Sequence, residues 1–314
     1  MCAKINNIYL FISCAAHSGS TLLALLLATH PRITSVGELR PMNIPKGYKI
    51  PECSCGAPIE ECTFWRNVDL EMEAKGHSFL NSTTSIDFSR FWVKIQTFPL
   101  GNRIFESLRK HVFNFVANEK TALDKLTRFH QHVAESALLY ENTDIFADAT
   151  KSYYLFNTLA QRLEFRERMH LKLIHLVRDV RGVAFSVAKR RRPQDWDKTI
   201  EIAAKYWVRA NQAVHLIQRA YMNANDVFLL RYSDLCHNPE ASIEQLSRFI
   251  GVTPKFLIGD IDNTQYHIFG NEMRKIRLKE IREDTQWQEK LSQSDLRTIK
   301  RIAGRMSQKY GVYL

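Results

Sequence analysis

The sequence has little of what marks unusual protein classes. Only 12 glycines and 9 prolines occur among 314 residues, so neither a fibrous repeat nor extensive disorder is indicated. Six cysteines are too few for a disulfide scaffold in a chain of this length. The longest apolar runs, residues 22–28 and 8–12, fall far short of the roughly 20 residues of a membrane-spanning helix. We therefore expect a globular protein without a membrane span, in a reducing cytoplasm.

A secretory signal is the alternative to the cytoplasmic prediction. Lys4 and the following IYLFISCAA resemble a basic region, a short hydrophobic region and a small-residue cleavage site. Cleavage there would remove the strand expected over 8–12, and the next loop depends on that strand. The cytoplasmic prediction is therefore preferred.

The charge of the chain is strongly positive. A formal net charge of +11 favours an anionic ligand, an acidic acceptor, a nucleic acid or an anionic surface. The chain has no recognisable nucleic-acid-binding motif and no clear interleaving of aromatic and basic residues. We therefore expect a small anionic ligand and no nucleic acid, and the sequence gives no indication of an oligomeric state.

Apolar segments that alternate with helical patterns predict an α/β fold. Strands are expected over 8–12, 145–148, 171–177 and 227–235, and helices over 183–189, 198–221 and 239–250. Such alternation implies parallel strands with right-handed crossovers. We expect one P-loop-like domain over 1–314, with a central parallel sheet of about five strands flanked by helices. A helical insertion over about 63–140, including patterns at 103–116 and 126–139, is expected to wall an acceptor pocket.

The segment 8–39 has the pattern of a phosphate-binding loop. An apolar strand leads into Ser18-Gly19-Ser20-Thr21 and then into a leucine-rich helix, and such a loop at a helix N-terminus presents N–H groups to an anion. The loop has no lysine and so lacks the GxxxxGK[ST] pattern of nucleotide hydrolases. A phosphate ligand other than ATP or GTP is implied, although serine and threonine also serve as plain helix caps.

A second phosphate site is indicated by Arg178 and Ser186, eight residues apart across a strand-to-helix turn. A guanidinium and a hydroxyl suit a terminal phosphate. Together, HSGSTLL, LVRDVRGVAFS and RYSDL resemble the sulfotransferases that use 3′-phosphoadenosine 5′-phosphosulfate (PAPS). The resemblance spans residues 8–40, 145–190 and 227–290, and residues 63–140 show none of it.

The resemblance implies a role for each matching position. The first loop would hold the 5′-phosphosulfate, and Arg178 and Ser186 the 3′-phosphate. Glu38, in a GE motif like that of tyrosylprotein sulfotransferases, would be the catalytic base, and Lys151 would stabilise the leaving group. The residues implied in donor binding are His17, Ser18, Gly19, Ser20, Thr21, Arg178, Ser186, Tyr232, Arg274 and Arg277.

His17 is a departure, because the family has arginine or lysine at this position. A neutral imidazole cannot supply the same permanent charge, so stabilisation of the transition state would fall more on Lys151. His17 could still donate a hydrogen bond to the sulfate if it is protonated or in the right tautomer. Other family members use a catalytic histidine, for which His111, His130 and His132 are candidates.

Each of these residues also has a plain structural interpretation. Arg178 and Asp179 can form a surface ion pair, Glu38 and Lys151 can be solvated, and Tyr232 can belong to the core. Arg274, Arg277 and the KRRR run at 189–192 can be solvent-facing charges, although the run can also attract an anionic acceptor or cofactor.

Three cysteines are grouped in CSCGAPIEEC, at Cys53, Cys55 and Cys62. They could bind zinc with a fourth ligand from elsewhere, but the CxC spacing is not the CxxC pair of common structural sites. The sequence favours a reduced or disulfide-linked loop and predicts no metal.

The sequence therefore predicts sulfuryl transfer from PAPS to a hydroxyl of a carbohydrate, a lipid or a small-molecule natural product, without a required metal. One alternative is a nucleotide-dependent phosphotransferase with Asp148 as the magnesium-holding acid. The other is a non-catalytic protein that binds PAPS or its product, adenosine 3′,5′-bisphosphate.

Overall fold

The computed structural model describes residues 7–39, 52–80, 117–257, 259, 261–262 and 265–314. The pattern at 103–116 and the candidate His111 lie outside these residues. Within the described ranges, no helix has the length and apolar character needed to cross a membrane.

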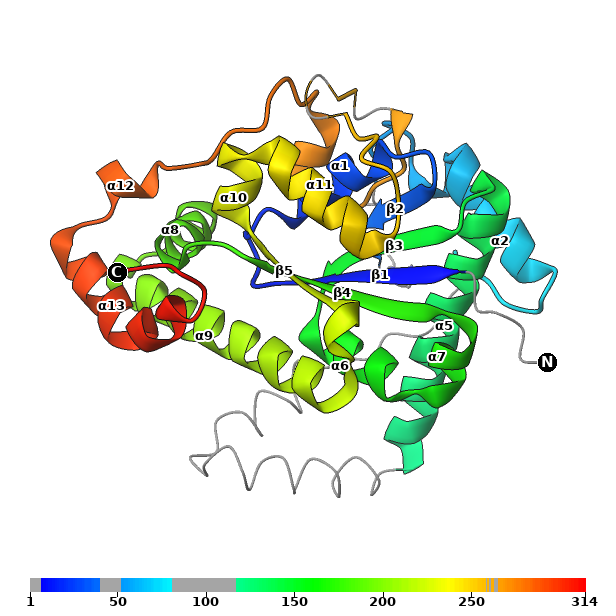
Figure 1. Ribbon diagram of the computed structural model, residues 1–314, viewed down its shortest axis with the longest axis horizontal. Helices are drawn as coiled ribbons and strands as arrows, with labels where there is room; N and C mark the ends of the chain where they lie inside the picture. The colour runs from blue at the N-terminus through cyan, green and yellow to red at the C-terminus, as the bar shows by residue number, and fades with distance from the viewer. Residues whose placement is uncertain (1–6, 40–51, 81–116, 258, 260, 263–264) are drawn as a thin grey trace.

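A five-stranded parallel sheet forms the centre of the fold, which confirms the predicted fold class (Figure 1). Its order is β2-β3-β1-β4-β5. The strands are β1 (Ile8–Ser13), β2 (Ile33–Gly37), β3 (Ile145–Lys151), β4 (His170–Val177) and β5 (Val227–Arg231). The sequence patterns did not identify β2 as a strand, and it pairs with β3 in the register Ile33 to Ile145.

Helices cover both faces of the sheet (Figure 1). One face carries α1 (Ser20–Ala28), α10 (Tyr232–His237) and α11 (Pro239–Ile250), and the other carries α5 (Ala117–Glu141), α6 (Tyr153–Gln161), α7 (Leu163–Arg168) and α9 (Trp196–Tyr221). On β1, Tyr9 and Phe11 pack toward α5 and α6, and Leu10 and Ile12 pack toward α1. Strand β1 is therefore buried on both faces, which explains why its sequence is a continuous apolar run.

The remaining helices extend these layers. Three helices pack with α9 in a separate hydrophobic cluster around Trp207. They are α8 (Val180–Arg191), α12 (Trp287–Lys290) and α13 (Gln293–Gln308). Beside the sheet, α2 (Thr63–Glu73) packs against α5. The prediction that residues 63–140 are mostly helical is thus confirmed for the described part of that segment.

The strand predicted over 227–235 is too long. It ends at Arg231, and Tyr232 is the first residue of α10 instead of a strand residue. Asp234 lies in the first turn of α10, where a carboxylate interacts favourably with the helix dipole.

One buried carboxylate connects several elements. Asp148 on β3 is 0% exposed. Its Oδ2 accepts a hydrogen bond from the Tyr9 hydroxyl at 2.7 Å and lies 3.4 Å from His130 Nδ1. Its Oδ1 accepts the Thr150 N–H at 2.7 Å. The Thr150 hydroxyl also bonds to this carboxylate and lies 3.0 Å from the Leu39 carbonyl oxygen. Asp148 therefore fixes the ends of β2 and β3 relative to β1 and α5.

We expect Asp148→Asn to lower the free energy of unfolding by about 3 kcal/mol, because the new amide nitrogen faces hydrogen-bond donors at a position that is 0% exposed. Urea unfolding near neutral pH measures the loss. The matched control is Glu244→Gln, whose side chain is 60% exposed and pairs with the exposed Arg248, and about 0.5 kcal/mol or less is expected there. Equal losses in the two variants would contradict the role of Asp148.

Candidate active site

The carboxyl ends of four adjacent strands meet at one edge of the sheet. The first loop (residues 14–19) follows β1, Glu38 follows β2, Lys151 ends β3, and Arg178 follows β4. Ser13 pairs with Lys151 on one side and with His175 on the other. Residues far apart in the sequence thus converge at the edge where open α/β sheets bind their ligands.

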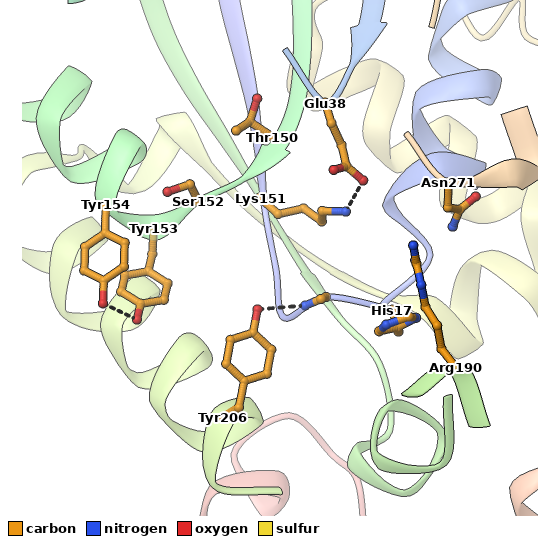
Figure 2. A pocket seen from close by; sticks show the side chains of 11 residues that line it. His17, Glu38, Thr150, Lys151, Ser152, Tyr153, Tyr154, Arg190, Tyr206 and Asn271 are labelled. Atoms are coloured by element: carbon orange, nitrogen blue, oxygen red, sulfur yellow. Dashed lines mark hydrogen bonds and ion pairs between the residues drawn. The ribbon is translucent and has the colours of Figure 1, made fainter. Parts of the chain in front are cut away.

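A cavity of about 400 Å³ opens at this edge (Figure 2). Its lining comes from the first loop, the ends of β2 and β3, and helices α6, α8 and α9. The residues that line it are Ala16, His17, Glu38, Thr150, Lys151, Ser152, Tyr153, Tyr154, Arg190, Tyr206 and Asn271.

Glu38 and Lys151 form an ion pair inside the cavity (Figure 2). Their side chains are only 11% and 18% exposed. The Glu38 N–H donates to the Phe269 carbonyl oxygen at 3.1 Å. Lys151 has a φ of +68°, and this left-handed conformation costs on the order of 1 kcal/mol for a residue with a Cβ. The Asp148 network, which holds the adjacent Thr150, stabilises this conformation.

The first loop ends at Gly19, the N-cap residue of α1. Gly19 has a φ of +92°, and a Cβ there would lie 2.4 Å from Tyr232 Cδ2, so only glycine fits. The simple capping role considered for the serines and threonine is not observed at the N-cap position, because that residue is Gly19 and has no side chain. The Ser18 hydroxyl is buried and has no hydrogen-bond partner among the residues that the structure describes. The first N–H groups of α1 therefore suit an anion.

His17 lies in the cavity close to three cationic side chains. Burial, followed by the charges of Arg190, Lys151 and Arg178, lowers the pKa of His17 to about 4. Its imidazole is therefore neutral at pH 7. The permanent positive charge of the site comes from Lys151, Arg178 and Arg190.

Arg178 is buried against the first loop. Its Nη1 donates to the His17 carbonyl oxygen at 2.9 Å, and its guanidinium lies 4.9 Å from the centre of the Tyr232 ring. Its Nη2 donates to the Asp284 carbonyl oxygen at 2.9 Å and lies 3.2 Å from a carboxylate oxygen of the same residue. The structure thus brings Arg178, Tyr232 and the first loop together, and an anion that approaches Nη2 competes with Asp284.

Three other residues singled out in the sequence are placed differently. Ser186 is half-buried on α8, one helical turn beyond Gly182, which packs against Arg178. Arg274 is buried, and its guanidinium donates to the carbonyl oxygens of Gly270, Asn271 and Glu52. Arg277 is exposed. The roles of Ser186, Arg274 and Arg277 in donor binding stay predictions.

The sequence reasoning missed several residues of the site. Arg190 belongs to the KRRR run, whose positive charge was the only signal for it. Tyr206 accepts a hydrogen bond from the Ala16 N–H at 3.1 Å, but on a long amphipathic helix nothing separates it from core residues. Tyr153, Tyr154 and Asp284 carried no recognised pattern.

The structure also places the residues of the alternative hypotheses. The Asp148 carboxylate is fully buried and bonded to Tyr9 and Thr150, so it is not available to hold magnesium. His130 Nδ1 lies 3.4 Å from the buried Asp148 carboxylate. The His132 ring stacks on His77, with ring centres 4.0 Å apart. Neither histidine lines the cavity.

Sequence comparison identifies the family. A family model described as "Sulfotransferase family" matches residues 96–255, about half of the chain. The match includes Lys151, Arg178 and Ser186 and begins inside the segment that showed no family motif. Comparison with curated protein sequences gives no match.

A solved sulfotransferase domain has a similar fold, and two further matches are sulfotransferases with lower scores. The sulfotransferase domain from the curacin biosynthetic pathway has a TM-score of 0.50 and 16% identity, over 97% of this chain and 99% of that domain. A sulfotransferase from Mycobacterium avium has a TM-score of 0.49 and 10% identity, over 99% of this chain and 79% of the other. The sulfotransferase domain of the Synechococcus PCC 7002 olefin synthase has a TM-score of 0.44 and 17% identity, over 96% and 98% of the two chains.

The family and the fold together define the class of this protein. The chain belongs to the sulfotransferase family, as its motifs predicted. At such low identity, the likeness to the curacin-pathway domain concerns the fold alone.

Two glycine substitutions test the contact between the first loop and Tyr232. Gly19→Ala and Gly251→Ala both place alanine at a positive φ, but no atom lies within 4 Å of the new Cβ at Gly251. We expect Gly251→Ala to cost about 1 kcal/mol and Gly19→Ala to cost about 1–3 kcal/mol more, because Tyr232 must move. Denaturant unfolding measures both variants. Equal costs would show that Tyr232 does not constrain the loop.

Proposed function

We propose that this protein transfers a sulfuryl group from PAPS to a hydroxyl of an acceptor molecule. The observation that carries the proposal is the Glu38–Lys151 pair in a cavity bordered by the first loop, with Arg178 bonded to that loop. A carboxylate that accepts a proton, a cation and an anion-binding helix N-terminus are groups that such a transfer can use.

The donor side of the site fits an anion with two separated charged groups. At the first loop, the first N–H groups of α1 and the buried Ser18 hydroxyl suit the phosphosulfate. At the end of β4, Arg178 suits the 3′-phosphate, with Ser186 on the same side of α8. The Tyr232 ring, which packs on Gly19 and Arg178, is available beside the nucleotide.

The residues of the cavity support a direct displacement. The acceptor oxygen forms a bond to sulfur while the bond from sulfur to the bridging oxygen breaks, and adenosine 3′,5′-bisphosphate leaves. The Glu38 carboxylate takes the proton of the acceptor hydroxyl. Lys151 stabilises the charge that develops on the bridging oxygen and the transferring group. Donor binding would thus draw the Lys151 ammonium away from Glu38 and free the carboxylate for the proton.

The acceptor would enter beside the tyrosines of the cavity. Tyr153 and Tyr154 lie across the cavity from His17 and Arg190 (Figure 2), and their hydroxyls are bonded at 2.8 Å. Aromatic rings with hydroxyl groups can pack against a sugar, a phenol or a polyketide and also hydrogen-bond to it. We therefore propose a small acceptor that bears a hydroxyl group.

A nucleotide panel tests the donor. We expect adenosine 3′,5′-bisphosphate at about 100 times its dissociation constant to stabilise the protein by about 2.7 kcal/mol, while ATP with magnesium gives a much smaller shift. Thermal-shift titration measures both, and adenosine 5′-monophosphate is the control for the 3′-phosphate. Stabilisation by ATP with magnesium alone would instead support the phosphotransferase.

A substitution at Glu38 tests the base and separates an enzyme from a binding protein. We expect Glu38→Gln to lower sulfuryl transfer about 10²- to 10⁴-fold and to retain binding of adenosine 3′,5′-bisphosphate. The assay follows labelled PAPS, with a cell extract as the source of acceptors. The control is Glu272→Gln, whose side chain is 80% exposed and which should transfer normally. Unchanged transfer in Glu38→Gln would refute the base, and absence of transfer by the unaltered protein would favour the binding protein.

A further inference from the structure

Four side chains that can bind a metal lie together outside the cavity. The sulfur atoms of Cys53, Cys55 and Cys62 and a ring nitrogen of His267 all lie within 4.8 Å of one another. Cys53 and Cys62 are buried, and Cys55 and His267 are half-buried. None of the three cysteines is in a disulfide. We call these four residues the Cys₃His cluster.

Two distances in the cluster match the edges of a tetrahedron around a metal ion, and a third is slightly shorter. In zinc sites the Zn–S bond is about 2.3 Å and the Zn–N bond is about 2.0–2.1 Å, so ligand atoms are separated by roughly 3.5–3.8 Å. Cys55 Sγ lies 3.7 Å from Cys62 Sγ, and His267 Nδ1 lies 3.6 Å from Cys53 Sγ and 3.2 Å from Cys62 Sγ. A disulfide would need a separation of about 2.05 Å.

A tight turn presents the first two cysteines. The Gly56 N–H donates to the Cys53 carbonyl oxygen at 3.0 Å, and the Cys53 N–H donates to the Ala57 carbonyl oxygen at 2.9 Å. Gly56 completes the turn with a φ of +88°. Both cysteines thus project from one short loop, although their spacing is CxC.

The other two ligands are positioned by neighbouring elements. Cys62 is the N-cap residue of α2, and the positive end of a helix favours a thiolate. The His267 ring stacks on Phe64 with ring centres 4.8 Å apart and an interplanar angle of 3°. Ser54 bonds to the main chain on both sides of His267, because its hydroxyl donates to the Tyr266 carbonyl oxygen and accepts the Ile268 N–H at 2.8 Å.

We propose that the Cys₃His cluster binds one Zn²⁺ ion as a structural site. Three thiolates and one imidazole form a donor set typical of tetrahedral structural zinc. With four protein ligands, the site has no open position for water or substrate. Loss of the thiol protons accompanies binding.

The ion would stabilise one wall of the cavity. His267 is two residues before Phe269, whose N–H donates to the Val36 carbonyl oxygen at 2.9 Å and whose carbonyl oxygen accepts the Glu38 N–H at 3.1 Å. Four residues after His267, Asn271 lines the cavity. Zinc would thus join the loop at 52–62 to the segment that holds the Glu38 main chain, without contact with the reacting atoms.

Metal analysis of the unaltered protein is the first test. We expect the full chain, purified without chelator, to contain about one zinc per chain by elemental mass spectrometry. After exchange into Co²⁺, we expect the visible absorption of tetrahedral cobalt and its thiolate charge-transfer band. Protein without bound metal that also gives no such cobalt spectrum would overturn the proposal, as would a Cys55–Cys62 disulfide found by mass spectrometry after alkylation.

Substitutions assign the ligands. We expect Cys55→Ser and His267→Asn each to lower the zinc content at least threefold after dialysis against a weak chelator. Cys236→Ser is the matched control, because Cys236 is another free cysteine outside the cluster, and its zinc content should equal that of the unaltered protein. Equal zinc contents in all the variants would overturn the assignment. These measurements use no donor or acceptor, so their outcome is independent of the proposed sulfuryl transfer.

Discussion

The arrangement of the site depends on the buried carboxylate of Asp148. Burial and this carboxylate raise the pKa of Tyr9 well above its usual value, so the Tyr9 hydroxyl stays a donor to Asp148. The other carboxylate oxygen is occupied by Thr150, which precedes Lys151 with its left-handed backbone. A hydrogen-bonded carboxylate without access to water is rigid, because each lost bond leaves an unsatisfied polar group. The position of the Lys151 ammonium at the end of β3 follows from this rigidity.

The charges around the cavity explain why a neutral histidine is compatible with position 17, where the resemblance to the family predicts arginine or lysine. Lys151, Arg178 and Arg190 already repel one another, and together with burial they lower the pKa of His17 to about 4. A fourth fixed charge would add to this repulsion. Two carboxylates compensate part of it, Glu38 on Lys151 and Asp284 on Arg178. Three cations against two carboxylates leave an excess of positive charge, which an anionic ligand at this edge of the sheet would compensate.

The sequence predicted the parts of the site that are encoded locally. A strand, a small-residue loop and a leucine-rich helix identify the first loop, and the order of elements predicts parallel strands whose ends meet. It did not identify β2, since five residues between a proline turn and a glycine give little periodicity. His267 and Tyr206 were also missed, because each reaches its partners only through tertiary packing. The CxC spacing argued against a metal because it is not the CxxC pair of common structural sites. His267 lies 205 residues from Cys62 in the sequence, and nothing in the sequence pattern linked it to the cysteines.

Glu38 is held from two sides by contacts that do not depend on each other. Its side chain is fixed by Lys151, which depends on the Asp148 network. Its main chain is fixed by Phe269, which lies close to the Cys₃His cluster. Gly37 permits this second contact, because a Cβ there would lie 2.0 Å from the Phe269 carbonyl oxygen. Loss of one set of contacts would leave the other in place, so the carboxylate would lose positional precision before the sheet lost its stability.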